Sequence, residues 1–216
     1  MQNADRSMLL ENLAAVGVQP DDIDYVILSH LHFDHAGGLL PTYNEIESGN
    51  QDLVFPKAQF IVGKTAWDRA RKPHYRDKAS FVPLLNQKLE ESGKLIVVDN
   101  LIAPAPLDEI IEFFESNGHT PGQMHTLIKG GHQKVVFAGD LIPGSAWVHL
   151  PITMGYDRYP ERLIEEKQNL YKKFEGDKFQ IFFTHDPKFA MGQLSRNEKG
   201  HYQVTHSQES FQQLEI

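Results

Sequence analysis

The chain has 216 residues, no cysteine, 40% hydrophobic residues and a formal net charge of −8. This length suits one well-buried domain, and the lack of cysteine excludes disulfides, thiolate metal sites and a cysteine nucleophile, so a metal site would have to use His, Asp and Glu. The negative charge disfavours a nucleic-acid partner. The sequence contains neither an apolar run long enough to span a bilayer nor a signal-peptide pattern, so we expect no membrane association and a cytoplasmic location.

Apolar runs and turn-forming residues predict strands and helices that alternate along the chain. Helices are expected over 8–16, around 81–91 and over 160–174. Strands are expected at 25–29, 58–62, 94–98 and 178–184, with a further apolar segment at 110–116, a hairpin within 124–140 and an edge strand at 202–206. This alternation predicts an α/β fold in a single domain, residues 1–216.

The stretch SHLHFDHAGG, residues 29–38, holds three histidines and an aspartate within six residues. In an extended segment His30 and His32 point to the same side, and a tight turn after Phe33 would bring Asp34 and His35 to an adjacent position. A cluster of histidines alone is often an incidental surface feature. The HxHxDH order of nitrogen and oxygen ligands favours metal binding instead, and the end of one strand could serve two ions.

Three apolar strands each lead into a ligand-type residue: YVILS into His30, VVFAG into Asp140 and IFFT into His185. Because α/β folds place their sites at strand ends, we expect these residues to converge on one edge of a sheet. His119 lies in the turn-rich segment NGHTPGQ and is a further candidate. Taken singly, His119 could be a loop histidine, Asp140 a turn residue and His185 a cap beside Asp186. Their occurrence together with HxHxDH favours ligation.

The segments SHLHFDHAGG, GHTPGQ, FAGD and FFTHD, in this order and spacing, resemble the metallo-β-lactamase fold hydrolases. Within that group the sequence is most similar to the bacterial N-acyl homoserine lactone lactonases and their methyl-parathion-hydrolase-like relatives, from about residue 9 to residue 190. The resemblance implies an αββα sandwich and seven metal ligands. One ion would be held by His30, His32 and His119, the second by Asp34, His35 and His185, and Asp140 would bridge them.

Seven ligands are too many for one tetrahedral zinc with an open position, but they suit two divalent ions that share a carboxylate and a bridging hydroxide. Zinc is the default, and an all-N/O site also accepts manganese, cobalt or iron. The hydroxide would attack a carbonyl or phosphoryl centre, and Asp34 could take up or pass on a proton. The sequence has no GxSxG element for a serine nucleophile.

Two departures from the family pattern qualify this interpretation. Related enzymes carry several strands ahead of the helix at 8–16, so the resemblance predicts a fold that lacks its N-terminal strands. The sheet edge exposed in this way favours association, for example as a homodimer.

The second departure concerns a tyrosine that the lactonases place just after the bridging aspartate. Here that segment reads AGDLIPGSAW, with Pro143 in the vicinity. Tyr156 and Tyr159, in MGYDRYPE, are the candidates for the role, and Tyr156 is our predicted catalytic tyrosine beside Asp34 and Asp140. Packing in the core or at the rim is the alternative for both tyrosines, since geometry has to precede an acid–base assignment.

Other polar residues are expected to be structural. The helix ERLIEEKQNLYKKF should expose its Glu and Lys side chains and direct Leu163, Leu170 and Phe174 inward. Five histidines have no evident partner in the sequence and are expected at the surface or on an edge strand: His74, His125, His132, His201 and His206.

The sequence favours a dinuclear metal hydrolase that opens the ester of a small-molecule lactone, such as an N-acyl homoserine lactone. Three alternatives stay open. The first is hydrolysis of phosphotriesters or other esters on the same metals. Thioester hydrolysis of the glyoxalase II type is less favoured, because the C-terminal segment is short and not basic. The third is a non-catalytic relative that keeps the ligands but does not assemble the site.

Overall fold

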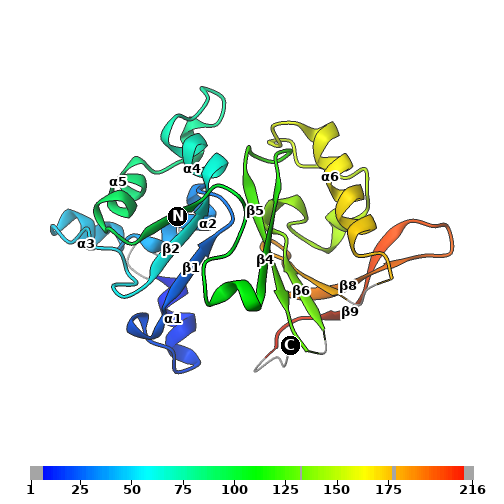
Figure 1. Ribbon diagram of the computed structural model, residues 1–216, viewed down its shortest axis with the longest axis horizontal. Helices are drawn as coiled ribbons and strands as arrows, with labels where there is room; N and C mark the ends of the chain where they lie inside the picture. The colour runs from blue at the N-terminus through cyan, green and yellow to red at the C-terminus, as the bar shows by residue number, and fades with distance from the viewer. Residues whose placement is uncertain (1–6, 132, 177–178, 212–216) are drawn as a thin grey trace. The chain divides into compact units, whose positions relative to one another are not determined.

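The computed structural model describes residues 7–131, 133–176 and 179–211. The chain divides into two compact units, Met1–Val98 and Asp99–Ile216, which are described separately below. Each unit contains a sheet and helices, so the predicted mixed α/β class is confirmed (Figure 1). Among the described residues no helix is long and apolar enough to cross a bilayer.

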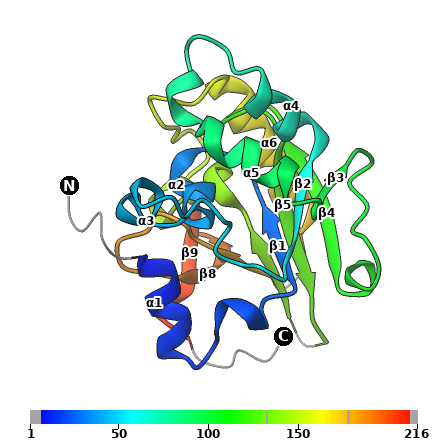
Figure 2. The same cartoon turned by 90° about the vertical axis from the view of Figure 1, so that its left-hand side faces the viewer.

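The first unit is built on three parallel strands in the order β1-β2-β3. These are β1 (Tyr25–Leu28), β2 (Gln59–Gly63) and β3 (Leu95–Val98). The helices of this unit are α1 (Met8–Ala15), α2 (Phe33–Ala36), α3 (Tyr43–Glu47), α4 (Lys64–Arg71) and α5 (Pro83–Glu91). Buried residues of α4 and α5 form one apolar core with β2, on the face that these helices cover (Figure 2).

The helix predicted around 81–91 begins at Pro83, because proline fits the first turn of a helix, where no backbone N–H is required. Helix α4 was not predicted from the sequence. Its segment KTAWDRAR is mostly polar and buries only Ala66, Trp67 and Ala70, so the apolar face is too narrow to stand out as a pattern.

The second unit contains a six-stranded sheet in the order β4-β5-β6-β7-β8-β9. The strands are β4 (Ile111–Ser116), β5 (Gln123–Lys129), β6 (Lys134–Phe137), β7 (Phe179–Phe182), β8 (Met191–Arg196) and β9 (Tyr202–Gln208). Neighbours are antiparallel except β6 and β7, which are parallel and are connected through helix α6 (Pro160–Lys173). A parallel pair requires such a crossover.

Helix α6 packs on this sheet through Leu163, Leu170 and, at its C-cap, Phe174, as predicted (Figure 1). The prediction that its lysines lie on a solvated face is wrong for Lys167, whose exposed fraction is 0%. From the sequence alone, a lysine in a polar helix segment is expected at the surface. Its charge can be buried here because backbone carbonyls surround it, and their positions cannot be predicted from the sequence.

The predicted hairpin is confirmed as the antiparallel pair β5 and β6, and β9 is an edge strand as expected. His74, His201 and His206 are exposed as predicted, and His132 lies outside the described residues. The prediction for His125 is wrong, because it is fully buried on the inner strand β5 between β4 and β6. Residue 178 of the strand predicted over 178–184 also lies outside the described part, as do residues 177 and 212–216.

The expectation that three ligand-bearing strands share one sheet edge is correct for two of them. Strands β6 and β7, which lead to Asp140 and His185, are adjacent and parallel. Strand β1, which leads to His30, belongs instead to the separate three-stranded sheet, where it pairs with β2. An apolar run with a polar end predicts a strand and its terminus but carries no information about its pairing partner.

Candidate metal centre

The first half of the HxHxDH motif is an extended segment that continues from β1. Leu31 is 1% exposed and lies in the apolar core of its unit. The rings of His30 and His32 lie edge to face with their centroids 4.5 Å apart, and ligand atoms of the two lie within 4.8 Å of one another. Side chains alternate along the extended backbone, so Leu31 points into the core while His30 and His32 point together to the other side, as predicted. The Oγ of Ser29 lies 3.1 Å from Nδ1 of His30, which fixes the ring further.

The second half of the motif is the first turn of α2, with His32 as its N-cap residue. The turn predicted after Phe33 is thus a short helix that begins at Phe33. It brings the His35 ring to 4.2 Å from the His30 ring, and places Nε2 of His35 3.7 Å from Oδ2 of Asp34. All four ligand-type side chains of the motif are therefore clustered within the first unit.

In the second unit, the carboxylate of Asp140 lies between two imidazoles. Asp140 sits in a short 3-10 turn just after β6 and is 2% exposed. Its Oδ2 is 3.2 Å from Nε2 of His119, and its Oδ1 is 3.3 Å from Nε2 of His185. The backbone N–H of Asp140 donates to Oε1 of Gln123. One oxygen thus faces each histidine, which is the arrangement expected of a bridging carboxylate.

His119 occupies a loop that is held tightly against α6. The carboxylate of Glu166 accepts hydrogen bonds from the backbone N–H groups of Asn117 and Gly118, both at 2.8 Å. A Cβ at Gly118 would lie 2.5 Å from the Cα of Leu163, so only glycine permits this approach. The turn residues predicted around His119 therefore have a packing role: they bring the loop onto the helix.

Asp157 orients the His119 ring from the side opposite Asp140. Its Oδ1 lies 2.9 Å from Nδ1 of His119, and its Oδ2 accepts the backbone N–H of Met154 at 2.6 Å. A buried carboxylate on the second ring nitrogen is the usual support of a metal-binding histidine, because it fixes the ring and its tautomer. Sequence reasoning missed Asp157, although its neighbour Tyr156 was singled out. Asp157 is far along the chain from the histidine that it contacts, so no motif of fixed spacing links the two residues in the sequence.

Tyr156, the predicted catalytic tyrosine, is 64% exposed, and its ring centroid lies 6.1 Å from that of His119. Tyr159 is also exposed and contributes its backbone N–H to the carbonyl of Gly118 at 2.8 Å. Neither side chain is core packing. The catalytic role of Tyr156 stays a prediction.

Two buried groups around this half of the site carry shifted pKa values. Burial lowers the pKa of His125 to about 3, helped by the nearby His119 and opposed by the carbonyl of Ala138. Nε2 of His125 lies 2.7 Å from Oγ of Ser116, so the neutral ring is hydrogen-bonded. Burial also lowers the pKa of Lys167, to about 8. Sequence reasoning placed Lys167 on a solvated helix face and His125 at the surface or on an edge strand.

The side chains assembled in each unit fit divalent metal ions by their chemistry. The first unit supplies three imidazoles and a carboxylate, and the second supplies two imidazoles and a carboxylate, all of them borderline or hard ligands that suit zinc and similar ions. In the second unit the imidazole with a carboxylate on each ring nitrogen adds the orientation that such ligands require.

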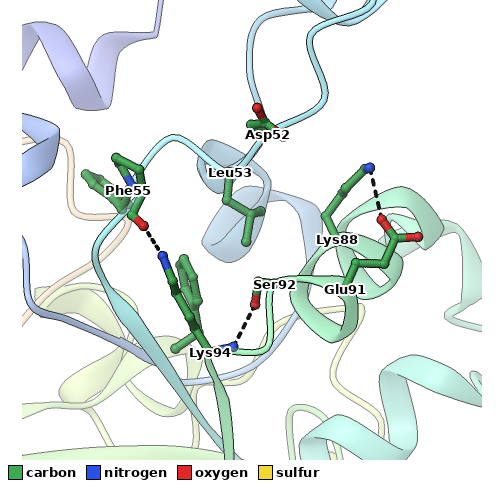
Figure 3. A pocket seen from close by; sticks show the side chains of 9 residues that line it. Asp52, Leu53, Phe55, Lys88, Glu91, Ser92 and Lys94 are labelled. Atoms are coloured by element: carbon green, nitrogen blue, oxygen red, sulfur yellow. Dashed lines mark hydrogen bonds and ion pairs between the residues drawn. The ribbon is translucent and has the colours of Figure 1, made fainter.

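A pocket of about 410 Å³ in the first unit is lined by none of the motif residues (Figure 3). Its two ammonium groups already have partners: Lys88 pairs with Glu91 at 3.0 Å, and Lys94 donates to the carbonyl of Pro56. Because the candidate ligands lie elsewhere and both ammonium groups are engaged, we do not assign the chemistry to this pocket.

Comparison of the sequence with known proteins identifies its family. The model of the metallo-β-lactamase superfamily matches residues 2–185. An N-acyl homoserine lactonase of Bacillus thuringiensis is 28% identical over 177 residues, which are 81% of this chain and 60% of that protein. The chain thus spans less than two thirds of the length of this curated relative.

Solved structures agree with this assignment. A probable metal-dependent hydrolase from Staphylococcus aureus has a TM-score of 0.76 at 28% identity, covering 92% of this chain and 68% of the other. The dizinc quorum-quenching lactonase AidC, in complex with a product, has a TM-score of 0.73 at 26% identity, covering 94% and 70%. The family match, the ligand pattern and the fold of the two units agree, and the chain therefore belongs to the metallo-β-lactamase superfamily.

Proposed function

We propose that the protein is a metal-dependent hydrolase that opens the ester of a lactone, such as an N-acyl homoserine lactone. The observation that carries this proposal is the carboxylate of Asp140, which lies between His119 and His185 with one oxygen toward each. The similarity to lactonases in sequence and fold supports the substrate class.

We propose seven metal ligands for two divalent ions, with zinc as the default. His30, His32 and His119 would hold one ion, Asp34, His35 and His185 the other, and Asp140 would bridge them. The local geometry within each unit supports this assignment, because each unit already gathers its share of the ligands. Bound in this way, two divalent ions supply a hydroxide nucleophile near neutral pH and polarise the ester carbonyl.

The residues of the chain contribute orientation and proton transfer. Asp157 keeps Nε2 of His119 directed at the carboxylate of Asp140 by holding the opposite ring nitrogen. The side chain of Asp34 is 38% exposed, so its carboxylate can exchange a proton with solvent during ring opening. The ring centroid of the exposed Tyr156 lies 6.1 Å from that of His119, and this proximity supports the proposal that its phenol donates a hydrogen bond to the lactone.

The proposal is tested with alanine variants and a substrate panel. His32→Ala and Asp140→Ala should each lower the metal content and abolish hydrolysis of acyl homoserine lactones, whereas His74→Ala, at an exposed histidine outside the cluster, should change neither. Full activity in both ligand variants would contradict the dinuclear mechanism.

The same panel separates the substrate classes. Lactones, phosphotriesters and thioesters are compared side by side with the wild-type protein, and the proposal expects the highest kcat/KM for a lactone. Preference for a phosphotriester would move the assignment to the alternative ester class. Metal binding without turnover of any ester would identify a non-catalytic relative. Sedimentation analysis of the same sample measures whether the chain forms the homodimer that the sequence favours.

A further inference from the structure

Lys167 is a fully buried lysine whose three N–H donors all have partners. Its Nζ donates to the backbone carbonyls of Trp147, His149 and Ile152 at 2.8, 3.1 and 2.7 Å. An ammonium group has three donors and no acceptor, so this set of carbonyls satisfies it completely. Burying a charge is costly unless it is hydrogen-bonded in this manner. The helix therefore holds one short loop segment by a single charged side chain.

Tyr171, one turn further along α6, extends the same contact. Its hydroxyl donates to the carbonyl of Val148 at 2.7 Å, and the side chain is 2% exposed. Two side chains on one face of α6 thus bind four carbonyls within residues 147–152. The segment forms a 3-10 helix at Ser145–Val148 and a turn bond from the N–H of Ile152 to the carbonyl of His149, and the donors from α6 complete the hydrogen bonding of its carbonyls.

The held segment is the middle of residues 143–159, which we call the strap. At one end the carbonyl of Pro143 accepts the backbone N–H of His185 at 2.8 Å. At the other end Asp157 holds Nδ1 of His119, and the backbone N–H of Arg158 donates to the carbonyl of His119 at 3.1 Å. Both histidines that flank Asp140 are therefore in direct contact with the strap.

We propose that Lys167 is a positioning residue: by fixing the middle of the strap, it holds the two ends that orient His119 and His185. This inference rests on the proposed function in taking these histidines as metal ligands. Without the ammonium, the carbonyls of Trp147 and Ile152 lose this donor, and that of His149 keeps the backbone N–H of Ile152. The strap then has to move toward water to satisfy them. The contacts at both ends then loosen together.

The test uses Trp147 as a reporter of the strap. The sequence has two tryptophans, Trp67 and Trp147, so a Trp67→Phe background leaves the strap residue as the single tryptophan, which is excited selectively at the red edge of its absorption. In this background Lys167→Met removes the donors at similar volume, and Lys172→Met, at an exposed lysine of the same helix, is the matched control. Acrylamide quenching, zinc affinity by competition with a chelator, and kcat/KM for a lactone are measured on each protein.

We expect Lys167→Met to raise the quenching constant and to weaken zinc binding about tenfold, the usual loss when the support of a metal ligand is removed. Lys172→Met should leave all three quantities unchanged. Unaltered quenching, or greater quenching with unaltered zinc affinity, would overturn the proposal. Zinc affinity and quenching are read without substrate, so a protein that lacks lactonase activity contradicts the proposed function and leaves this test intact.

If Lys167→Met does not fold, Tyr171→Phe carries the test, since it deletes one strap hydrogen bond and leaves the packing of the ring. A smaller change in the same two quantities supports the proposal, and no change in either overturns it.

Discussion

His125 should make the folded protein lose stability as the pH falls. Burial lowers its pKa to about 3 in the folded state, from 6.5 for an ordinary histidine. Between these two values the unfolded chain binds a proton that the folded chain does not, so the free energy of unfolding decreases as the pH falls below 6.5. Above pH 6.5 the ring is neutral in both states, and this contribution to stability is fully present.

The size of the effect follows from the width of this window. One pKa unit corresponds to about 1.4 kcal/mol, so the full shift is worth about 5 kcal/mol, and the two units between pH 6.5 and pH 4.5 are worth about 2.7 kcal/mol. Small domains are stable by only about 5–15 kcal/mol, so one histidine can remove a large part of the stability in mild acid.

The assay compares wild type with His125→Leu by denaturant unfolding at pH 7.5 and pH 4.5, with a chelator present so that metal release does not contribute. At pH 7.5 the variant should be less stable, by about 1–3 kcal/mol, because the buried hydroxyl of Ser116 loses its 2.7 Å hydrogen bond with His125 and keeps the longer one from the Gln123 amide at 3.5 Å. At pH 4.5 the difference should shift by about 2.7 kcal/mol in favour of the variant.

Ser116→Ala is the matched control. It removes the same hydrogen bond but keeps the buried ring, so its stability should change with pH as that of the wild type does. The reasoning is refuted if the free-energy difference between His125→Leu and wild type is the same at both pH values.

Three further substitutions have defined outcomes. Gly118→Ala should destabilise the protein by about 1–3 kcal/mol in denaturant unfolding, because its Cβ would lie 2.5 Å from the backbone of Leu163, and an unchanged midpoint would mean that the loop does not pack there. Asp157→Asn should weaken zinc binding about 10–100-fold in a chelator competition, since His119 loses its carboxylate partner, and unchanged affinity would contradict this role. Tyr156→Phe should lower kcat for lactones with the metal content unchanged, and wild-type kcat would remove Tyr156 from the catalytic set.

The parts of the fold that could be predicted are those in which the residue pattern within one short segment determines the local structure. The alternation in HxHxDH separates Leu31 from His30 and His32, and the structure places them on opposite sides as expected. The long helix α6 and the β5–β6 hairpin have strong periodicity or turn residues. The sheet to which β1 belongs could not be predicted, because pairing is decided by residues distant in sequence.

The supporting residues of the candidate site were missed for a related reason. Asp157 is 38 residues from His119 in sequence, and Glu166 is 48 residues from Gly118. Lys167 and Glu166 have the composition of a solvated helix face, and nothing in their immediate neighbours shows that loops will cover them. Ligands next to strand ends can be found by pattern, whereas the groups that orient them depend on which loop returns to which helix.

The proposed dinuclear hydrolase is tested most directly by measuring the metal content of the purified 216-residue chain together with its lactonase activity. Divalent metals are counted by elemental analysis, and acyl homoserine lactone hydrolysis is followed on the same sample before chelation, after chelation and after zinc is restored. We expect about two ions per chain, with turnover that disappears on chelation and returns with zinc. Less than one ion per chain, or turnover that chelation leaves unchanged, would contradict it.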